Sequence, residues 1–103
     1  MLIGSQWVNA QDGRTLEVIA PSDGQVFDHI PRGTAQDVDS AVAAARAALS
    51  GSWGQLNATE RGRIMTAISM SVLANEAELA QLEARDTGKP LTTARNDIKV
   101  LAR

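Results

Sequence analysis

A Gly-Lys pair near the C-terminal end of the chain is the first group whose residue types could do chemistry. In the stretch "EARDTGKP", Gly88 and Lys89 match the Gly-Lys pair near the end of a P-loop, the phosphate-binding loop of nucleotide-binding proteins. A P-loop also needs a glycine five residues before that pair and a Ser or Thr directly after the lysine. Glu83 and Pro90 occupy those two positions. The sequence therefore excludes a P-loop, because neither the anion-binding turn nor the hydroxyl ligand for magnesium can form.

The other residues with catalytic or metal-binding side chains lack the partners that their chemistry needs. His29 is the only histidine, and without a second ligand nearby we expect it to lie on the surface. Glu76 and Glu78 are two residues apart on an expected helix, so they point in different directions and do not form a glycosidase pair. The chain has no cysteine, which excludes disulfides, cysteine-zinc sites and thiol catalysis within these 103 residues.

Composition limits the class of protein and its partners. A length of 103 residues suits one small domain or a piece of a larger one. The net charge of −2 and an aromatic content of 3% offer neither a basic stripe nor a base-stacking platform, so we expect no nucleic-acid partner. No apolar run is long enough to span a membrane, and the first residues lack the pattern of a secretory signal. A cytoplasmic location is expected.

Residues 1–31 predict an antiparallel β-meander. Short runs rich in β-branched and aromatic residues are separated by turn sequences that contain Asp12-Gly13 and Asp23-Gly24. Glycine following aspartate suits the left-handed backbone of tight turns.

Residues 34–103 predict a helical segment with about four helices, because the hydrophobic period changes from two to 3.6. The first helix is capped by Thr34 and Asp37 and ends at Gly51. The second begins after Asn57. The expected buried face of the first helix carries Val38, Ala41, Val42, Ala45 and Leu49. That of the second carries Ile64, Met65, Ile68 and Val72.

The third and fourth helices meet at the opening stretch. The third restarts at Asn75 and has Leu79 and Leu82 as its apolar stripe. Gly88 suits the left-handed residue after a helix end, and Pro90 prevents continuation of the old helix while favouring a new one. In the last helix Ile98 and Leu101 are spaced for burial. We expect this helix to be cut short at the chain end and the strand edges to be left open, as in part of a larger fold.

These elements describe an α/β fold, and their sequence resembles the N-terminal part of the aldehyde dehydrogenase superfamily. The resemblance runs from about Leu2 to the end, through "IGSQWVNAQDGRTLEVIAPSDGQVFDHIPRGTAQDVDSAVAAARAAL", the Trp53 region, "ATERGRIM" and "LEARDTGKPL". Each block alone could occur in unrelated helices. Their joint order and spacing, closed by "LExxDTGKP", is specific to the family.

The resemblance implies that residues 1–103 belong to a Rossmann-type cofactor domain within a longer subunit. Such a subunit oxidises an aldehyde to a carboxylic acid with NAD or NADP, through a cysteine thioester. The expected partners are an aldehyde substrate and further copies of the subunit, in a homodimer or homotetramer. Because no cysteine is present, this segment cannot catalyse alone, and no catalytic or cofactor-binding residue is assigned within it.

The resemblance also implies one binding site, for a structural sodium or potassium ion. Asp86 follows Leu82 by four residues, on the expected buried face and near the negative end of a helix, so its carboxylate needs a partner. In many aldehyde dehydrogenases the matching aspartate holds a monovalent cation together with main-chain oxygens, and the resemblance puts Val18 and Ile19 at those positions here. Two structural roles compete with this one: pairing with a basic side chain, or accepting hydrogen bonds from backbone N–H groups around Gly88.

A non-enzymatic function is the alternative. The chain would then be a stand-alone α/β interaction domain or a truncated relative that binds a partner through strand edges or a helix face. The coding sequence beyond Arg103 distinguishes the two functions. The enzyme requires a downstream "GQxC"-type cysteine block and an "ELGGK"-type glutamate block.

Overall fold

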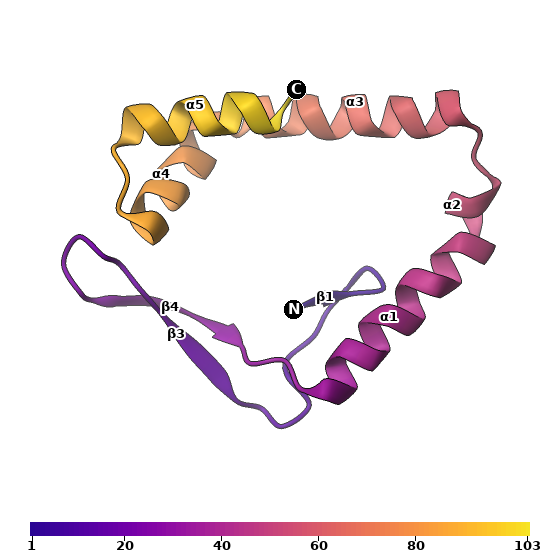
Figure 1. Cartoon of the computed structure of the whole chain (residues 1–103), viewed down its shortest axis with the longest axis horizontal. Coiled ribbons are helices and arrows are strands. Elements are labelled where there is room, and N and C mark those ends of the chain that lie inside the picture. Colours follow the sequence, from indigo (N-terminus) through magenta and orange to yellow (C-terminus); the bar gives the residue numbers. More distant parts are fainter. The chain divides into compact units, whose positions relative to one another are not determined.

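The computed structural model describes residues 1–103, which form four short strands and five helices (Figure 1). The strands are β1 (Leu2–Ile3), β2 (Gln6–Trp7), β3 (Thr15–Ile19) and β4 (Val26–Pro31). The helices are α1 (Ala35–Ser50), α2 (Ser52–Gln55), α3 (Ala58–Ala74), α4 (Glu76–Thr87) and α5 (Leu91–Leu101). The expected α/β fold is confirmed, with a single turn of helix, α2, in addition to the four helices that were predicted.

The chain folds as two compact units. Unit 1 contains Met1–Val18 and Asp28–Asn57, and unit 2 contains Ile19–Phe27 and Ala58–Arg103. Unit 1 therefore holds β1, β2, α1 and α2, whereas unit 2 holds α3, α4 and α5. The hairpin of β3 and β4 is divided, with its tip in unit 2.

The first strands form a separate hairpin, and not the start of a continuous meander. β1 and β2 pair antiparallel, with Leu2 opposite Trp7, and β3 pairs only with β4. Gly4 and Ser5 connect β1 to β2 with φ angles of 55° and 69°, as the tight two-residue turn of a hairpin requires. The strands thus form two separate two-stranded sheets where one meander was predicted, and the loop after β2 is attached to α1 instead: the N–H of Gln11 donates to Asp37 at 3.3 Å.

The two predicted Asp-Gly turns are confirmed. Gly13 and Gly24 both have φ of 70°. In each turn the preceding aspartate accepts a hydrogen bond from the backbone two residues on: Asp12 from Arg14 at 3.0 Å, and Asp23 at 2.9 Å. Local side-chain hydrogen bonds of this kind fix a turn without help from the rest of the chain.

The capping box predicted for α1 is also present. The backbone N–H and the hydroxyl of Thr34 both donate to Oδ2 of Asp37 at 2.8 Å, and the N–H of Asp37 donates back to the Thr34 hydroxyl at 3.3 Å. Asp37 is only 5% exposed. Together with the bond from Gln11, these contacts make Asp37 the residue that joins the loop after β2 to the start of α1.

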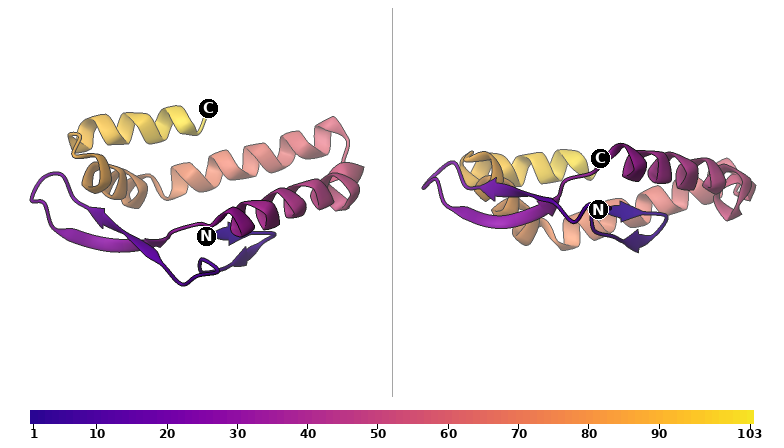
Figure 2. Two further views of the ribbon diagram at one scale, coloured as in Figure 1. Left: turned by 60° about the horizontal axis from the view of Figure 1, so that its bottom comes forward. Right: turned by 90° about the horizontal axis from the view of Figure 1, so that it is seen from below.

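The face of α1 that packs in unit 1 differs from the predicted one. α1 contacts β1, and both views of Figure 2 show the β1–β2 hairpin beside this helix. The contact uses small residues: a Cβ placed on Gly4 would lie 3.5 Å from the Cβ of Ala44. Val38, Val42 and Leu49 are exposed instead. The hairpin approaches closely enough that alanine fits against it where a large side chain would not.

Unit 2 is built around a contact between α4 and α5. Ala80 on α4 and Ala94 on α5 have no exposed surface, and Ile98 is almost fully buried beside them. Half-buried side chains then pack against this cluster, namely Val72 of α3 with Leu79 and Ala84 of α4. Small residues at the contact let two helix backbones come close together.

Several large apolar side chains predicted to be buried in unit 2 are exposed. They are Ile64, Met65 and Ile68 of α3, Leu82 of α4 and Leu101 of α5. The helices form as predicted, but no neighbouring element of unit 2 covers these side chains. Ile98 is the predicted core residue of α5 that the structure confirms.

The predicted stop and restart between α4 and α5 is confirmed. Gly88 follows α4 with φ of 74°, and its N–H donates to the carbonyl of Ala84 at 2.9 Å. Pro90 precedes the first residue of α5. A Cβ at Gly88 would lie 3.2 Å from the Cβ of Pro21, so the turn also lies against the tip of the β3–β4 hairpin.

Substitution of Gly88 by alanine is expected to destabilise unit 2 by about 1–2 kcal/mol. The left-handed backbone disfavours any residue with a Cβ by that amount, and the approach of Pro21 adds crowding. Gly62→Ala is the matched control, since a Cβ at this exposed position of α3 meets nothing within 4 Å. The control should stabilise by about 0.5–1 kcal/mol, because alanine favours a helix over glycine. Urea unfolding followed by circular dichroism measures both; equal effects of the two substitutions would contradict the structure.

Asp37 makes the stability of unit 1 depend on pH. The hydrogen bonds from the backbone and hydroxyl of Thr34 lower the pKa of Asp37 below its ordinary value. Its stabilisation is therefore complete above the ordinary pKa of an aspartate and is lost as the pH falls through the lower pKa of the folded state. Asp37→Asn should lower the urea midpoint at neutral pH, and the difference from wild type should disappear in strong acid. Asp39→Asn, at an exposed position of the same helix, is the matched control and should leave the urea midpoint at neutral pH nearly unchanged.

Candidate functional site

Three charged side chains meet where α4 leads into α5. Nζ of Lys89 is 2.6 Å from Oε1 of Glu83 on α4 and 2.8 Å from Oδ2 of Asp97 on α5. These hydrogen bonds, first that to Asp97 and then that to Glu83, raise the pKa of Lys89. An ammonium held in this way stays protonated and is a poor nucleophile or base. The Lys89 group connects two helices, and it is not arranged to do catalysis.

The tip of the β3–β4 hairpin lies against the same end of α4 within unit 2. The guanidinium carbon of Arg85 is 4.4 Å from the centre of the Phe27 ring, which is a cation–π contact. Pro21 approaches Gly88 next to it, and Ala20 is almost completely buried. The hairpin tip is thus fixed by apolar and cation–π contacts, and Arg85 is engaged in a structural interaction.

Asp86, the predicted cation ligand, is exposed on the last turn of α4. The expectation that it shares a buried face with Leu82 is wrong, because α4 turns Ala80 toward α5 and leaves Leu82 in solvent. Neither structural alternative is seen within unit 2, since no hydrogen bond or ion pair there involves the Asp86 carboxylate. The other predicted ligands, Val18 and Ile19, are consecutive residues of β3 at the junction of units 1 and 2. The ligand set stays a prediction.

The remaining candidate residues are also placed without a catalytic arrangement. His29 is exposed on β4, as expected. Glu76 pairs with Lys99 of α5, with Oε1 and Nζ 3.7 Å apart, while Glu78 is exposed. No group of three or more histidine or acidic side chains is placed to hold a metal ion.

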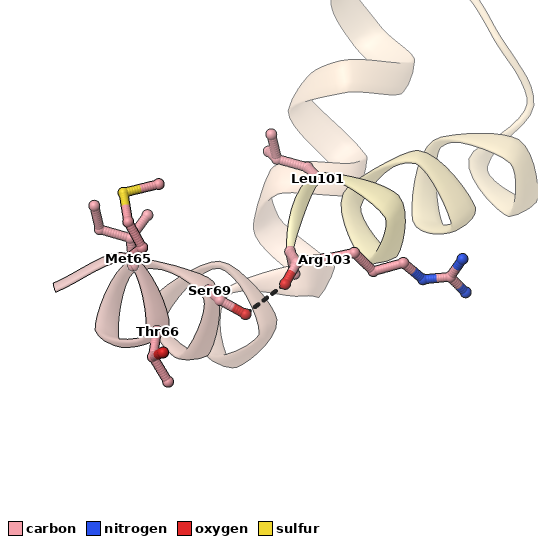
Figure 3. A pocket seen from close by; sticks show the side chains of 7 residues that line it. Met65, Thr66, Ser69, Leu101 and Arg103 are labelled. Carbon is pink, nitrogen blue, oxygen red and sulfur yellow. Dashed lines mark hydrogen bonds between the residues drawn. The ribbon is translucent and has the colours of Figure 1, made fainter. Parts of the chain in front are cut away.

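Unit 2 has an open pocket of about 250 Å³ between α3 and the end of α5 (Figure 3). Met65, Thr66 and Leu101 line it, and the hydroxyl of Ser69 donates to the carbonyl of Ala102 across one side. The guanidinium of Arg103 points away from the pocket (Figure 3). The pocket therefore contains no acid, base or nucleophile with an activating partner. Sequence reasoning missed it because Met65 and Leu101 were interpreted as core residues.

None of the helices combines the length and the apolar character that crossing a bilayer would require.

Comparison with known proteins gives a consistent result along the chain. A model of the aldehyde dehydrogenase family matches residues 7–103. A curated aldehyde dehydrogenase from Davidiella tassiana is 38% identical over 100 residues, which cover 97% of this chain and 20% of that protein. The chain spans only 10% to 20% of the length of such curated relatives.

Solved structures agree in fold as well as in sequence. A crystal structure from Burkholderia cenocepacia, assigned as an aldehyde dehydrogenase, is 50% identical and superimposes with a TM-score of 0.98. It covers 99% of this chain, which corresponds to 22% of that one. The NAD-dependent aldehyde dehydrogenase from Sinorhizobium meliloti is 38% identical, with a TM-score of 0.95 over 99% of this chain and 21% of its own.

Proposed function

Since the chain belongs to the aldehyde dehydrogenase family, we propose that it forms the N-terminal part of a subunit that oxidises an aldehyde to a carboxylic acid. The observation that carries this proposal is the family match over residues 7–103, which takes in every helix. NAD or NADP is the proposed oxidant, and support for NAD comes from the S. meliloti protein, which is NAD-dependent. The complete enzyme is proposed to be a homodimer or homotetramer.

The chemistry of the proposed reaction needs groups that these residues do not supply. A cysteine thiolate adds to the aldehyde carbonyl, and water later hydrolyses the thioester to release the acid. The nicotinamide cofactor, when bound, accepts the hydride that leaves the aldehyde carbon. The 103 residues contain no cysteine, so the proposed nucleophile belongs to another part of the subunit.

The proposed role of this segment is structural. Large apolar side chains are exposed in both units, among them Trp7 at 84% and Leu101 at 68%. Exposed apolar surface of this extent is typical of a face that other polypeptide covers. Each unit would then pack its exposed apolar face against other parts of the larger subunit. Substitutions here would change the stability of that subunit more than its choice of substrate.

The full-length protein is expected to reduce NAD or NADP when a short aliphatic aldehyde is added. Absorbance of the reduced nicotinamide measures the reaction, with each cofactor tested separately. Residues 1–103 produced alone are the control and should show no activity, because the nucleophile is missing. A full-length product that reduces neither cofactor with any aldehyde of a broad panel would contradict the proposal and favour the stand-alone interaction domain.

A structural monovalent cation is the second part of the proposal. The carboxylate of Asp86 and the main-chain oxygens of Val18 and Ile19 are hard oxygen ligands of the kind that sodium and potassium prefer. The support in this structure is the exposed Asp86 carboxylate, which no side chain of unit 2 neutralises.

Thermal unfolding of the full-length protein tests for the cation. Sodium or potassium chloride should raise the melting temperature above that in choline chloride at equal ionic strength, because a ligand that binds the folded state stabilises it. Asp86→Asn should abolish this difference. Glu78→Gln, at an exposed position of the same helix, is the matched control and should preserve it. An unchanged difference in the Asp86 variant would contradict the assignment of that residue.

A further inference from the structure

The chain has few lysines. Of its ten basic residues only Lys89 and Lys99 are lysines, and the others are arginines. The distinction matters in a protein proposed to meet aldehydes. A neutral lysine amine condenses with an aldehyde, whereas the arginine guanidinium stays protonated.

The two lysines have different surroundings in unit 2. The Lys89 ammonium makes short, charge-assisted hydrogen bonds with carboxylates on both α4 and α5, and its side chain is 29% exposed. Nζ of Lys99 is 3.7 Å from the single carboxylate of Glu76, beyond hydrogen-bond distance, and its side chain is 54% exposed. Lys99 is thus both more accessible and less firmly held.

The reaction requires the ammonium to lose a proton. The proton passes to solvent, and the nitrogen lone pair forms a bond to the carbonyl carbon while the carbonyl π bond breaks and one amine proton moves to the oxygen, which gives a carbinolamine. Loss of the hydroxyl group together with the remaining amine proton, as water, then leaves an imine, with no change in oxidation state. At Lys89 this sequence must break two charge-assisted hydrogen bonds and leave Glu83 and Asp97 facing each other uncompensated, which opposes the first step.

We propose that Lys99 is the lysine of this chain at which small aldehydes form a covalent imine, and that Glu83 and Asp97 protect Lys89 from the same reaction. The proposal rests on the proposed function only for the source of the aldehyde. The imine is reversible, so adducts would follow the aldehyde concentration around the protein.

Peptide mass spectrometry of the full-length protein tests the proposal directly. The protein is treated with propanal, and cyanoborohydride is added to reduce the imine to a stable amine, with no nicotinamide cofactor present. In the native protein we expect severalfold more adduct at Lys99 than at Lys89. In urea the two positions should react equally, because the surroundings that distinguish them are lost. Equal yields in the native protein, or more adduct at Lys89, would overturn the proposal.

Variants separate protection by carboxylates from simple exposure. The double substitution Glu83→Gln with Asp97→Asn should raise the Lys89 adduct toward that of Lys99, whereas Glu76→Gln should change the Lys99 adduct little. Lys99→Arg keeps a cation beside Glu76 and should remove the adduct at position 99 without increasing the one at Lys89. A Lys89 adduct that does not respond to the double substitution would overturn the protective role. Because no nicotinamide is used, these results do not depend on dehydrogenase activity.

Discussion

The close approach of α4 and α5 at Ala80 and Ala94 is the contact on which unit 2 depends. Both alanines are fully buried, and no large side chain in the chain is. The geometry that brings these backbones together is set by the turn at Gly88, and the Lys89 ion pairs connect the same two helices. Ile98 and the half-buried Val72 then pack against a surface that the alanines have defined. Protein interiors are close-packed, so a contact built on methyl groups leaves little room for variation.

Features that depend on a few neighbouring residues could be predicted from the sequence. The turns at Gly13 and Gly24, the capping box of Thr34 and Asp37, and the helix end at Gly88 all form as expected. Each is fixed by backbone sterics or by a hydrogen bond within a few positions along the chain.

The buried faces could not be predicted in the same way. Leu82, Ile68 and Leu101 have the spacing of core residues, yet burial depends on which element covers a face, and that is a property of the whole structure. The hydrophobic periodicity also gave too little importance to alanine, whose side chain is only weakly hydrophobic but is small enough to fit where two helix backbones approach. For the same reason Asp86 was expected on a buried face and is exposed. The two ion pairs of Lys89 were missed because Asp97 lies on the next helix. Lys89 lies in the predicted turn, with Glu83 before it and Asp97 after it, so their opposite charges could have suggested the pairing.

The hydrogen bond from Gln11 to Asp37 has a consequence for the order of folding. The capping box joins residues three positions apart and can form as soon as α1 begins to form, whereas the bond from Gln11 joins residues 26 positions apart. Closing the longer loop loses more chain entropy, so it belongs to a later step. The Asp37 carboxylate would then already be held at the start of α1 when the N–H of Gln11 reaches it. Nucleation of α1 would therefore precede attachment of the N-terminal hairpin during synthesis and refolding.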